Sequence, residues 1–178
     1  MFMRNFFGHL FTITRHRHQV FVHCCKAGIP LQGLLHDLSK YSPAEFIPGV
    51  RFYQGDRSPT EIERREFGCS RAWMHHKGRN KHHFEYWNDY NPKKRMPEAV
   101  EMPLKYVKEM FCDRVAASKI YQGKLYTEDS PIKYFLSGNA RYIMHPKTAE
   151  LLQQWLEMLQ NEGEKATFDY IKSFKTEN

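Results

Sequence analysis

The chain has 178 residues, of which 41% are hydrophobic and 26% charged, and its formal net charge is +7 at pH 7. This composition excludes intrinsic disorder and predicts a single domain, over residues 1–178, that buries a core of its own. No segment approaches the roughly 20 apolar residues of a membrane-spanning helix, so we expect no membrane partner. The positive net charge favours anionic partners: nucleic acid, nucleotides or other phosphate esters.

The N-terminal part of the chain has a helical pattern. Residues 1–11 carry a short apolar patch interrupted by Gly8, without a small-residue cleavage site, so we expect folded sequence of a cytoplasmic protein rather than a signal peptide. Apolar residues recur at helical intervals over residues 11–27, and Gly28 ends that helix. A second, short helix is predicted over residues 31–38.

Two segments carry the signature of a helix start, in which serine is the N-cap, proline takes the first helical position and glutamate completes a capping box. They are Ser42-Pro43-Ala44-Glu45 and Ser58-Pro59-Thr60-Glu61. The second start predicts a long helix that reaches at least Met74. The polar, proline-containing stretch over residues 88–97 predicts a loop.

The second half of the chain is also predicted to be helical. We expect a helix over residues 98–122, in which Pro103 marks either a kink or the true first turn, and Gly123 ends it. The C-terminal helices are predicted over residues 130–138, 146–161 and 165–174. No segment alternates as a strand does, so the predicted fold is all-α, one compact helical domain.

Histidines and one His-Asp pair dominate the first half of the chain. Nine of the ten histidines precede residue 84, and the pair His36-Asp37 follows a short apolar run. Adjacent histidine and aspartate offer one nitrogen and one oxygen to a divalent cation, a mixture that suits zinc, iron, manganese or nickel. Asp113 lies in an amphipathic segment with small residues, where a buried carboxylate must be paired or bound to metal. The conjunction predicts a metal site assembled from several helices.

Helical geometry ranks the histidines of the first helix without deciding between them. His16 shares a stripe with Val20, four residues on, as an inward-pointing ligand would. His18 lies roughly 200° around the helix from His16 and is expected to face solvent or substrate. His23 lies two turns beyond His16 and remains a further alternative.

Two doubled histidines follow in a basic stretch. The pairs His75-His76 and His82-His83 are seven residues apart, a spacing that returns to nearly the same helical face. Gly78 lies between them and either continues the helix or breaks it, so that the second pair turns back. In both cases one imidazole of each pair reaches a common centre. The other histidine of each pair would form a basic rim with Lys77, Arg79, Asn80 and Lys81.

The stripe His16-x-x-x-Val20, followed by Leu34-Leu35-His36-Asp37-x-x-Lys40, resembles the core of the HD-domain superfamily of metal-dependent phosphohydrolases. The signature of that superfamily is a histidine on one helix, His-Asp on the next and a distant aspartate on a later helix. Residues 36–46 and 76–83 are similar to an uncharacterised bacterial and phage family of HD-like proteins. The similarity covers about residues 10–120 and leaves the last third unexplained.

The resemblance implies a ligand set. The first metal would be held by His16, His36, Asp37 and Asp113, with His18 and His23 as alternatives to His16. A second metal would be held by His76 and one of His82 and His83, with Asp37 bridging. The implied cofactor is one or two divalent ions, with iron, manganese, zinc, nickel and magnesium as candidates.

The resemblance also implies a function, namely hydrolysis of a nucleotide or other small phosphate ester by metal-activated water. Asp37 would bind metal and orient the nucleophile, and Lys40 and Arg79 would contact phosphate oxygens, with Lys77 as an alternative to Arg79. Lys40 is equally explained as a cation at a helix C-terminus. Two other functions remain open: a di-iron oxygenase of the same superfamily, and a non-enzymatic, nucleic-acid-binding helical module with a structural metal.

Overall fold

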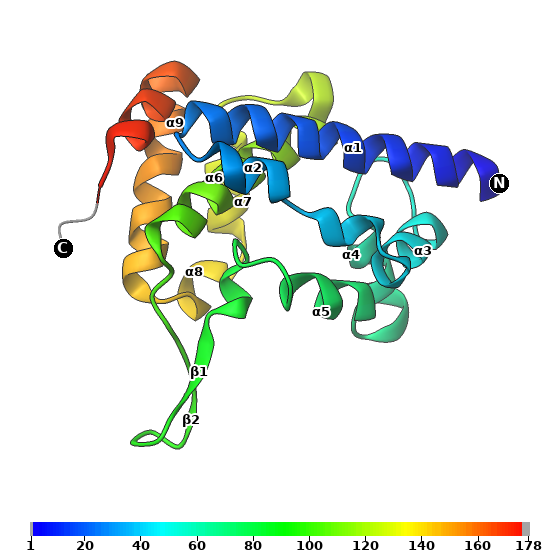
Figure 1. Ribbon diagram of the computed structural model, residues 1–178, viewed down its shortest axis with the longest axis horizontal. Helices are drawn as coiled ribbons and strands as arrows, with labels where there is room; N and C mark the ends of the chain where they lie inside the picture. The colour runs from blue at the N-terminus through cyan, green and yellow to red at the C-terminus, as the bar shows by residue number, and fades with distance from the viewer. Residues whose placement is uncertain (1, 176–178) are drawn as a thin grey trace.

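A long N-terminal helix, α1 (Phe2–Lys26), runs along one side of the molecule in this computed structural model, which describes residues 2–175 (Figure 1). The described residues form a compact, mostly helical domain, as predicted. The other helices of the first half are α2 (Pro30–Leu35), α3 (Pro43–Arg51), α4 (Pro59–Phe67) and α5 (Arg71–Lys77). Those of the second half are α6 (Leu104–Gln122), α7 (Ser130–Ser137), α8 (Ala140–Ile143) and α9 (Pro146–Ser173). Short 3-10 turns are η1 (Leu38–Tyr41), η2 (Phe84–Tyr86) and η3 (Gly123–Leu125).

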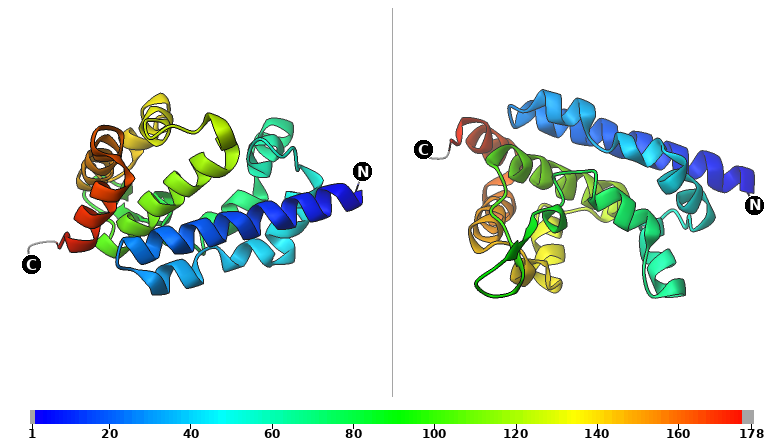
Figure 2. Two further views of the ribbon diagram at one scale, coloured as in Figure 1. Left: turned by 90° about the horizontal axis from the view of Figure 1, so that it is seen from above. Right: turned by 60° about the horizontal axis from the view of Figure 1, so that its bottom comes forward.

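Helix α1 holds the two halves of the molecule together. It begins already at Phe2 rather than at Phe11, and it packs against both α2 and α6. Its buried positions follow the predicted helical stripe, with His16, Val20 and Cys24 facing inward. Figure 2 shows α1 and α2 side by side, with α6 on the other side of α1 from α2 in the left view.

The pair His36-Asp37 does not lie on a helix, contrary to the prediction of a helix over residues 31–38. Helix α2 ends at Leu35, His36 is extended with φ −54° and ψ 130°, and Asp37 is left-handed with φ 52°. On a helix, neighbouring side chains diverge by about 100°. The break lets both side chains point into the protein, where each is 1% exposed. Aspartate is among the few residues that adopt this left-handed conformation readily.

The two serine-proline helix starts are confirmed, but their capping boxes are not. Helices α3 and α4 begin at Pro43 and Pro59, yet neither preceding serine side chain caps its helix. The Glu45 carboxylate is instead turned into the protein, onto histidines of α5. This glutamate therefore has a tertiary role.

The helix expected to reach Met74 is interrupted. Helix α4 ends at Phe67, because Gly68 adopts a left-handed conformation with φ 75°. A new helix, α5, begins at Arg71, and the hydroxyl of its N-cap Ser70 accepts a hydrogen bond from the Trp73 backbone N–H. Because of this break, the histidines of α5 lie on a different helix from the residues of α4.

Residues 88–99 form a hairpin, so the prediction of a loop there and of no strand was wrong. Strand β1 (Asn88–Asn91) pairs antiparallel with β2 (Met96–Ala99), and Asn88 lies opposite Ala99. The Asn91 side-chain carbonyl accepts the backbone N–H groups of the turn. The hairpin projects from the molecule (Figure 1) and is largely exposed on both faces, so it lacks the alternation that marks a half-buried strand.

The C-terminal helices supply most of the core. Helix α6 begins at Leu104, which makes Pro103 its N-cap, and the predicted stop at Gly123 is confirmed. Gly163 is non-helical inside α9 and divides it near the boundary predicted between two helices, whereas the short α8 was not predicted. Aromatic side chains of α6 and α9 pack edge to face around Phe111, Trp155 and Phe168. Within residues 2–175, no helix combines the length and apolar character needed to cross a membrane.

Candidate metal centre

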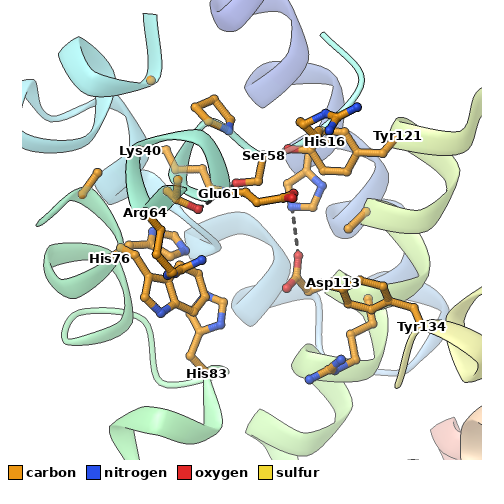
Figure 3. Close-up of a pocket in the computed structure, with 18 of the residues that line it drawn as sticks. His16, Lys40, Ser58, Glu61, Arg64, His76, His83, Asp113, Tyr121 and Tyr134 are labelled. Atoms are coloured by element: carbon orange, nitrogen blue, oxygen red, sulfur yellow. Dashed lines mark hydrogen bonds and ion pairs between the residues drawn. The ribbon is translucent and has the colours of Figure 1, made fainter. Parts of the chain in front are cut away.

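Four predicted ligands meet in one buried cluster. His16 comes from α1, His36 and Asp37 from the link after α2, and Asp113 from α6. The His16 Nε2 atom lies 3.0 Å from Asp113 Oδ1, and His36 Nε2 lies 3.2 Å from Asp37 Oδ2. Each residue offers a ligand atom within 4.8 Å of the others. Figure 3 shows His16 and Asp113 facing each other.

A second cluster adjoins the first and shares Asp37. Helix α5 ends at Lys77, and the chain after Gly78 turns back, so that His76 and the pair His82-His83 approach the same carboxylate. The His76 Nε2 and His82 Nε2 atoms lie 3.3 Å and 3.5 Å from Asp37 Oδ1. The alternative in which Gly78 breaks the helix is therefore the observed one.

Asp37 lies between the two clusters. Its Oδ2 atom faces the histidines of the first cluster and its Oδ1 atom those of the second. The Lys40 ammonium, from η1, lies 2.7 Å from Oδ2. A carboxylate with separate ligand sets on its two oxygens has the arrangement of a bridge between two cations.

Two buried carboxylates lie behind the histidines. Glu109 Oε1 lies 2.9 Å from His36 Nδ1 and 3.1 Å from His82 Nδ1. Glu45 Oε2 lies 2.7 Å from His76 Nδ1. A carboxylate on the outer ring nitrogen fixes the orientation of an imidazole and leaves the inner nitrogen free to bind metal.

Sequence reasoning missed both carboxylates. Glu109 precedes Asp113 by one helical turn, so the i, i+4 spacing on a predicted helix was the available signal. Glu45 was assigned to a capping box, and only its tertiary contacts with His75 and His76 reveal its position.

Several polar atoms at the centre make no well-aligned hydrogen bond among the described residues, although Asp37 Oδ2 forms an ion pair with Lys40 and His16 Nε2 lies 3.0 Å from Asp113 Oδ1. These atoms are Nε2 of His16, His36, His82 and His83 and both carboxylate oxygens of Asp37, all of them buried. Leaving such atoms unsatisfied in a protein interior is costly. The same atoms point at one another from two sides of Asp37. Nitrogen and oxygen donors in this arrangement fit one or two divalent transition ions.

The carboxylates of the centre are held in their ionised form. Burial opposes the charge of Asp37, but His36, Lys40 and His76 nevertheless bring its pKa well below the usual range. Asp113 has a similarly lowered pKa despite its burial, because His16 and His36 contact it. Burial disfavours the charged form of His36, but Asp37, together with Asp113 and Glu109, raises the pKa of this histidine well above its usual value. The centre thus presents anionic oxygens.

A cavity of about 1060 Å³ opens onto the centre. The cavity is lined by His16, Lys40, His76, His83 and Asp113 of the centre, as Figure 3 shows, and by Glu45. Side chains of α4, α6 and α7 complete the part of the wall shown there, among them Arg64, Tyr121 and Tyr134. The cavity places the candidate ligands within reach of a small molecule.

The structure distinguishes between the predicted alternatives. His18 is exposed, and His23 is buried with its ring nitrogens on the Gln19 side chain and the Cys112 carbonyl, so His16 is the histidine of α1 that reaches the cluster. Arg79 is exposed, donates to the His75 carbonyl and does not line the cavity. Its predicted role at the phosphate therefore has no support in this geometry.

The residues of the centre lie inside a segment shared with other proteins. A family model described as a family of unknown function, DUF5662, matches residues 5–158. The chain belongs to this family. The DUF5662 match spans both clusters and the first part of α9. No curated protein and no solved structure matches the chain.

Proposed function

We propose that the chain is a metal-dependent phosphohydrolase of HD-domain type, acting on a nucleotide or another small phosphate ester. The observation that carries this proposal is the position of Asp37, whose two oxygens face separate sets of histidines. The distances are 3.2 Å to His36 on one side and 3.3 Å to His76 on the other. A histidine from α1, a His-Asp pair and an aspartate from α6 also follow the order of the HD-domain signature.

Two divalent ions held in this centre would supply a water nucleophile near neutral pH and positive charge for phosphoryl oxygens. The protein supplies the positioning. Glu109 and Glu45 orient the imidazoles through their outer nitrogens. Lys40 lines the cavity, and its ammonium would donate a charge-assisted hydrogen bond to a phosphate oxygen while it keeps Asp37 ionised. The side chains of His36, Asp37 and His82 are each 1% exposed, which limits their contact with bulk water.

The experiment is a screen of phosphate monoesters, diesters and nucleotides with the wild type and Asp37→Ala. We expect hydrolysis by the wild type and none by the variant, with helical content by circular dichroism largely unchanged. Asp169→Ala, at an exposed i, i+4 ion pair with Lys165, is the matched control and should hydrolyse as the wild type does. Hydrolysis that persists in Asp37→Ala would overturn the assignment.

Two other results would replace this function with another. Dioxygen consumption by the iron-loaded protein, without phosphate release, would identify an oxygenase. Strongly salt-dependent binding of nucleic acid that survives His36→Ala, again without hydrolysis, would identify a basic nucleic-acid-binding module with a structural metal. Each result is read from the same protein preparations as the screen.

A further inference from the structure

Two charged side chains in the cavity wall have buried polar atoms without a partner. Arg114 Nε, on α6, and Glu85 Oε2, in η2, are both buried and make no hydrogen bond to another described residue. Both residues line the cavity that opens onto the metal centre. An unsatisfied buried charge is costly, and in a native protein it requires an explanation.

Two other charged residues of the same cavity, Arg57 and Glu63, have partners within the protein. Arg57 makes two hydrogen bonds to Asp56, and Glu63 accepts from Ser70. Arg114 and Glu85 have opposite charges and share a cavity, yet they are not among the ion pairs within 4.0 Å in the described chain. Both side chains line the cavity, so a ligand there that offers an acceptor to Arg114 and a donor to Glu85 would meet their unsatisfied polar groups.

Arg114 is placed to receive an anion. It follows Asp113 directly on α6, and its guanidinium carbon lies 5.5 Å from the ring centroid of Phe135, on α7. The aromatic ring supports the guanidinium plane at the edge of the centre. A planar guanidinium with free N–H groups matches two oxygens of a phosphoryl group.

Glu85 has the opposite requirement: burial raises its pKa, and in its ionised form the carboxylate only accepts hydrogen bonds. The donor must come from the part of the ligand beyond its phosphoryl group. Space for that part exists, since one turn beyond Arg114 the cavity face of α6 carries the small residues Ala117 and Ser118. A cavity of about 1060 Å³ also exceeds what an inorganic phosphate ion fills.

We propose that Arg114 binds the phosphoryl oxygens of the substrate and that Glu85 accepts a hydrogen bond from a hydroxyl group on its organic part. The substrate class is then a phosphorylated polyol or sugar, with a free hydroxyl near the phosphate. This inference rests on the proposed function, which brings a phosphate ester to the centre. It adds two residues that lie outside the ligand set.

Binding of phosphonates tests the proposal without turnover, because their C–P bond is not a phosphate ester bond. The probes are 2,3-dihydroxypropylphosphonate and propylphosphonate, titrated by calorimetry into metal-loaded protein. A hydrogen bond to a charged group corresponds to about 10- to 100-fold in affinity. We therefore expect the dihydroxy compound to bind about 10- to 100-fold more tightly to the wild type, and Glu85→Leu to abolish this preference.

Arg114→Ala should weaken both phosphonates and inorganic phosphate by a similar factor. Arg114→Lys keeps the charge and the apolar stem, so it should fold if the alanine variant does not, and should bind with intermediate affinity. Arg71→Ala, at an exposed arginine outside the cavity, should bind as the wild type does. Equal affinities for Arg114→Ala and wild type, or for the two phosphonates in the wild type, would overturn the proposal.

The two proposals fail differently. Hydrolysis of phosphate esters with unchanged binding in Arg114→Ala and Glu85→Leu removes these two residues from substrate recognition and leaves the hydrolase. Arg114-dependent binding of phosphonates by a protein that hydrolyses no ester supports the binding site and removes the hydrolase.

Discussion

Glu109 and Asp113 lie one turn apart on α6, and their carboxylates flank the same imidazole. Glu109 Oε1 is 2.9 Å from Nδ1 of His36, and Asp113 Oδ1 is 3.7 Å from Nε2 of that ring. One helix therefore supplies both a candidate ligand and the carboxylate that orients another. The geometry of the centre therefore depends on α6 at two positions.

Replacing Glu109 with glutamine should weaken metal binding while leaving the ligands in place. An outer carboxylate that holds a metal-binding histidine typically contributes about 10- to 100-fold in affinity. Competition with a chromogenic chelator measures this change. Glu101→Gln, at an exposed carboxylate before α6, is the matched control. Unchanged affinity in Glu109→Gln would show that the contacts with His36 and His82 do not orient ligands.

Lys40→Met should lower kcat/KM for the best phosphate ester by about 10- to 100-fold, because a charge-assisted hydrogen bond to the phosphate is lost. The unbranched methionine side chain keeps the apolar stem. Metal content, measured in the same preparation, should remain at the wild-type level. If the variant loses its metal but hydrolyses normally once metal is restored, Lys40 supports metal binding through Asp37 and does not contact the phosphate.

Close packing between α1 and α2 should make Gly33 intolerant of a methyl group. An added Cβ would lie 2.6 Å from Cys24 Cβ and 3.0 Å from Phe21 Cα, so the helices must separate. We expect Gly33→Ala to lower the free energy of unfolding by about 1–3 kcal/mol. It should also weaken metal binding, because α2 leads into His36.

Gly138→Ala is the control for this substitution, since the nearest atom to its added Cβ is 4.0 Å away and its φ is −101°. Its free energy of unfolding should stay within about 0.5 kcal/mol of the wild type. Urea unfolding measures both variants. Equal stabilities would contradict the tight contact between α1 and α2.

His23 should make the protein less stable in mild acid. Burial is the main cause that lowers its pKa from 6.5 to about 4. Between these values the unfolded chain takes up a proton that the folded chain does not. The free energy of unfolding should therefore fall by about 1.4 kcal/mol per pH unit from pH 6.5 to 4 through this residue, and this contribution is constant above and below that window.

Urea unfolding of wild type and His23→Gln between pH 7.5 and 4 tests this dependence, because the difference between them removes the titration of the metal centre. His18→Gln, at an exposed position of the same helix, should keep the wild-type slope. Parallel curves for His23→Gln and wild type would show that His23 titrates normally.

Local signals predicted much of the helical frame. The serine-proline starts located α3 and α4, Gly123 located the end of α6, and Gly163 marks the division of α9. These features depend on the conformational limits of proline and glycine, which act within a few residues. The hairpin after Asn88 was missed because its strands are exposed and do not alternate.

The candidate ligands were named from the sequence through its resemblance to the HD-domain signature, with His18 and His23 left as alternatives to His16. What the sequence did not reveal is how the ligands converge. The left-handed Asp37 and the partners of Glu45 and Glu109 depend on contacts between α1, α3, α5 and α6. Such contacts join residues far apart in the chain, where local periodicity carries no information.

Asp37 and the histidines on its two sides would hold two divalent ions, and elemental analysis of untagged protein is the direct test of this proposal. We expect two equivalents of a divalent transition metal per folded chain. We also expect the loss of both in Asp37→Ala and their retention in His18→Ala, whose histidine is exposed. A wild-type protein that is fully folded and binds no metal, even after incubation with iron, manganese, zinc or nickel, would contradict the account.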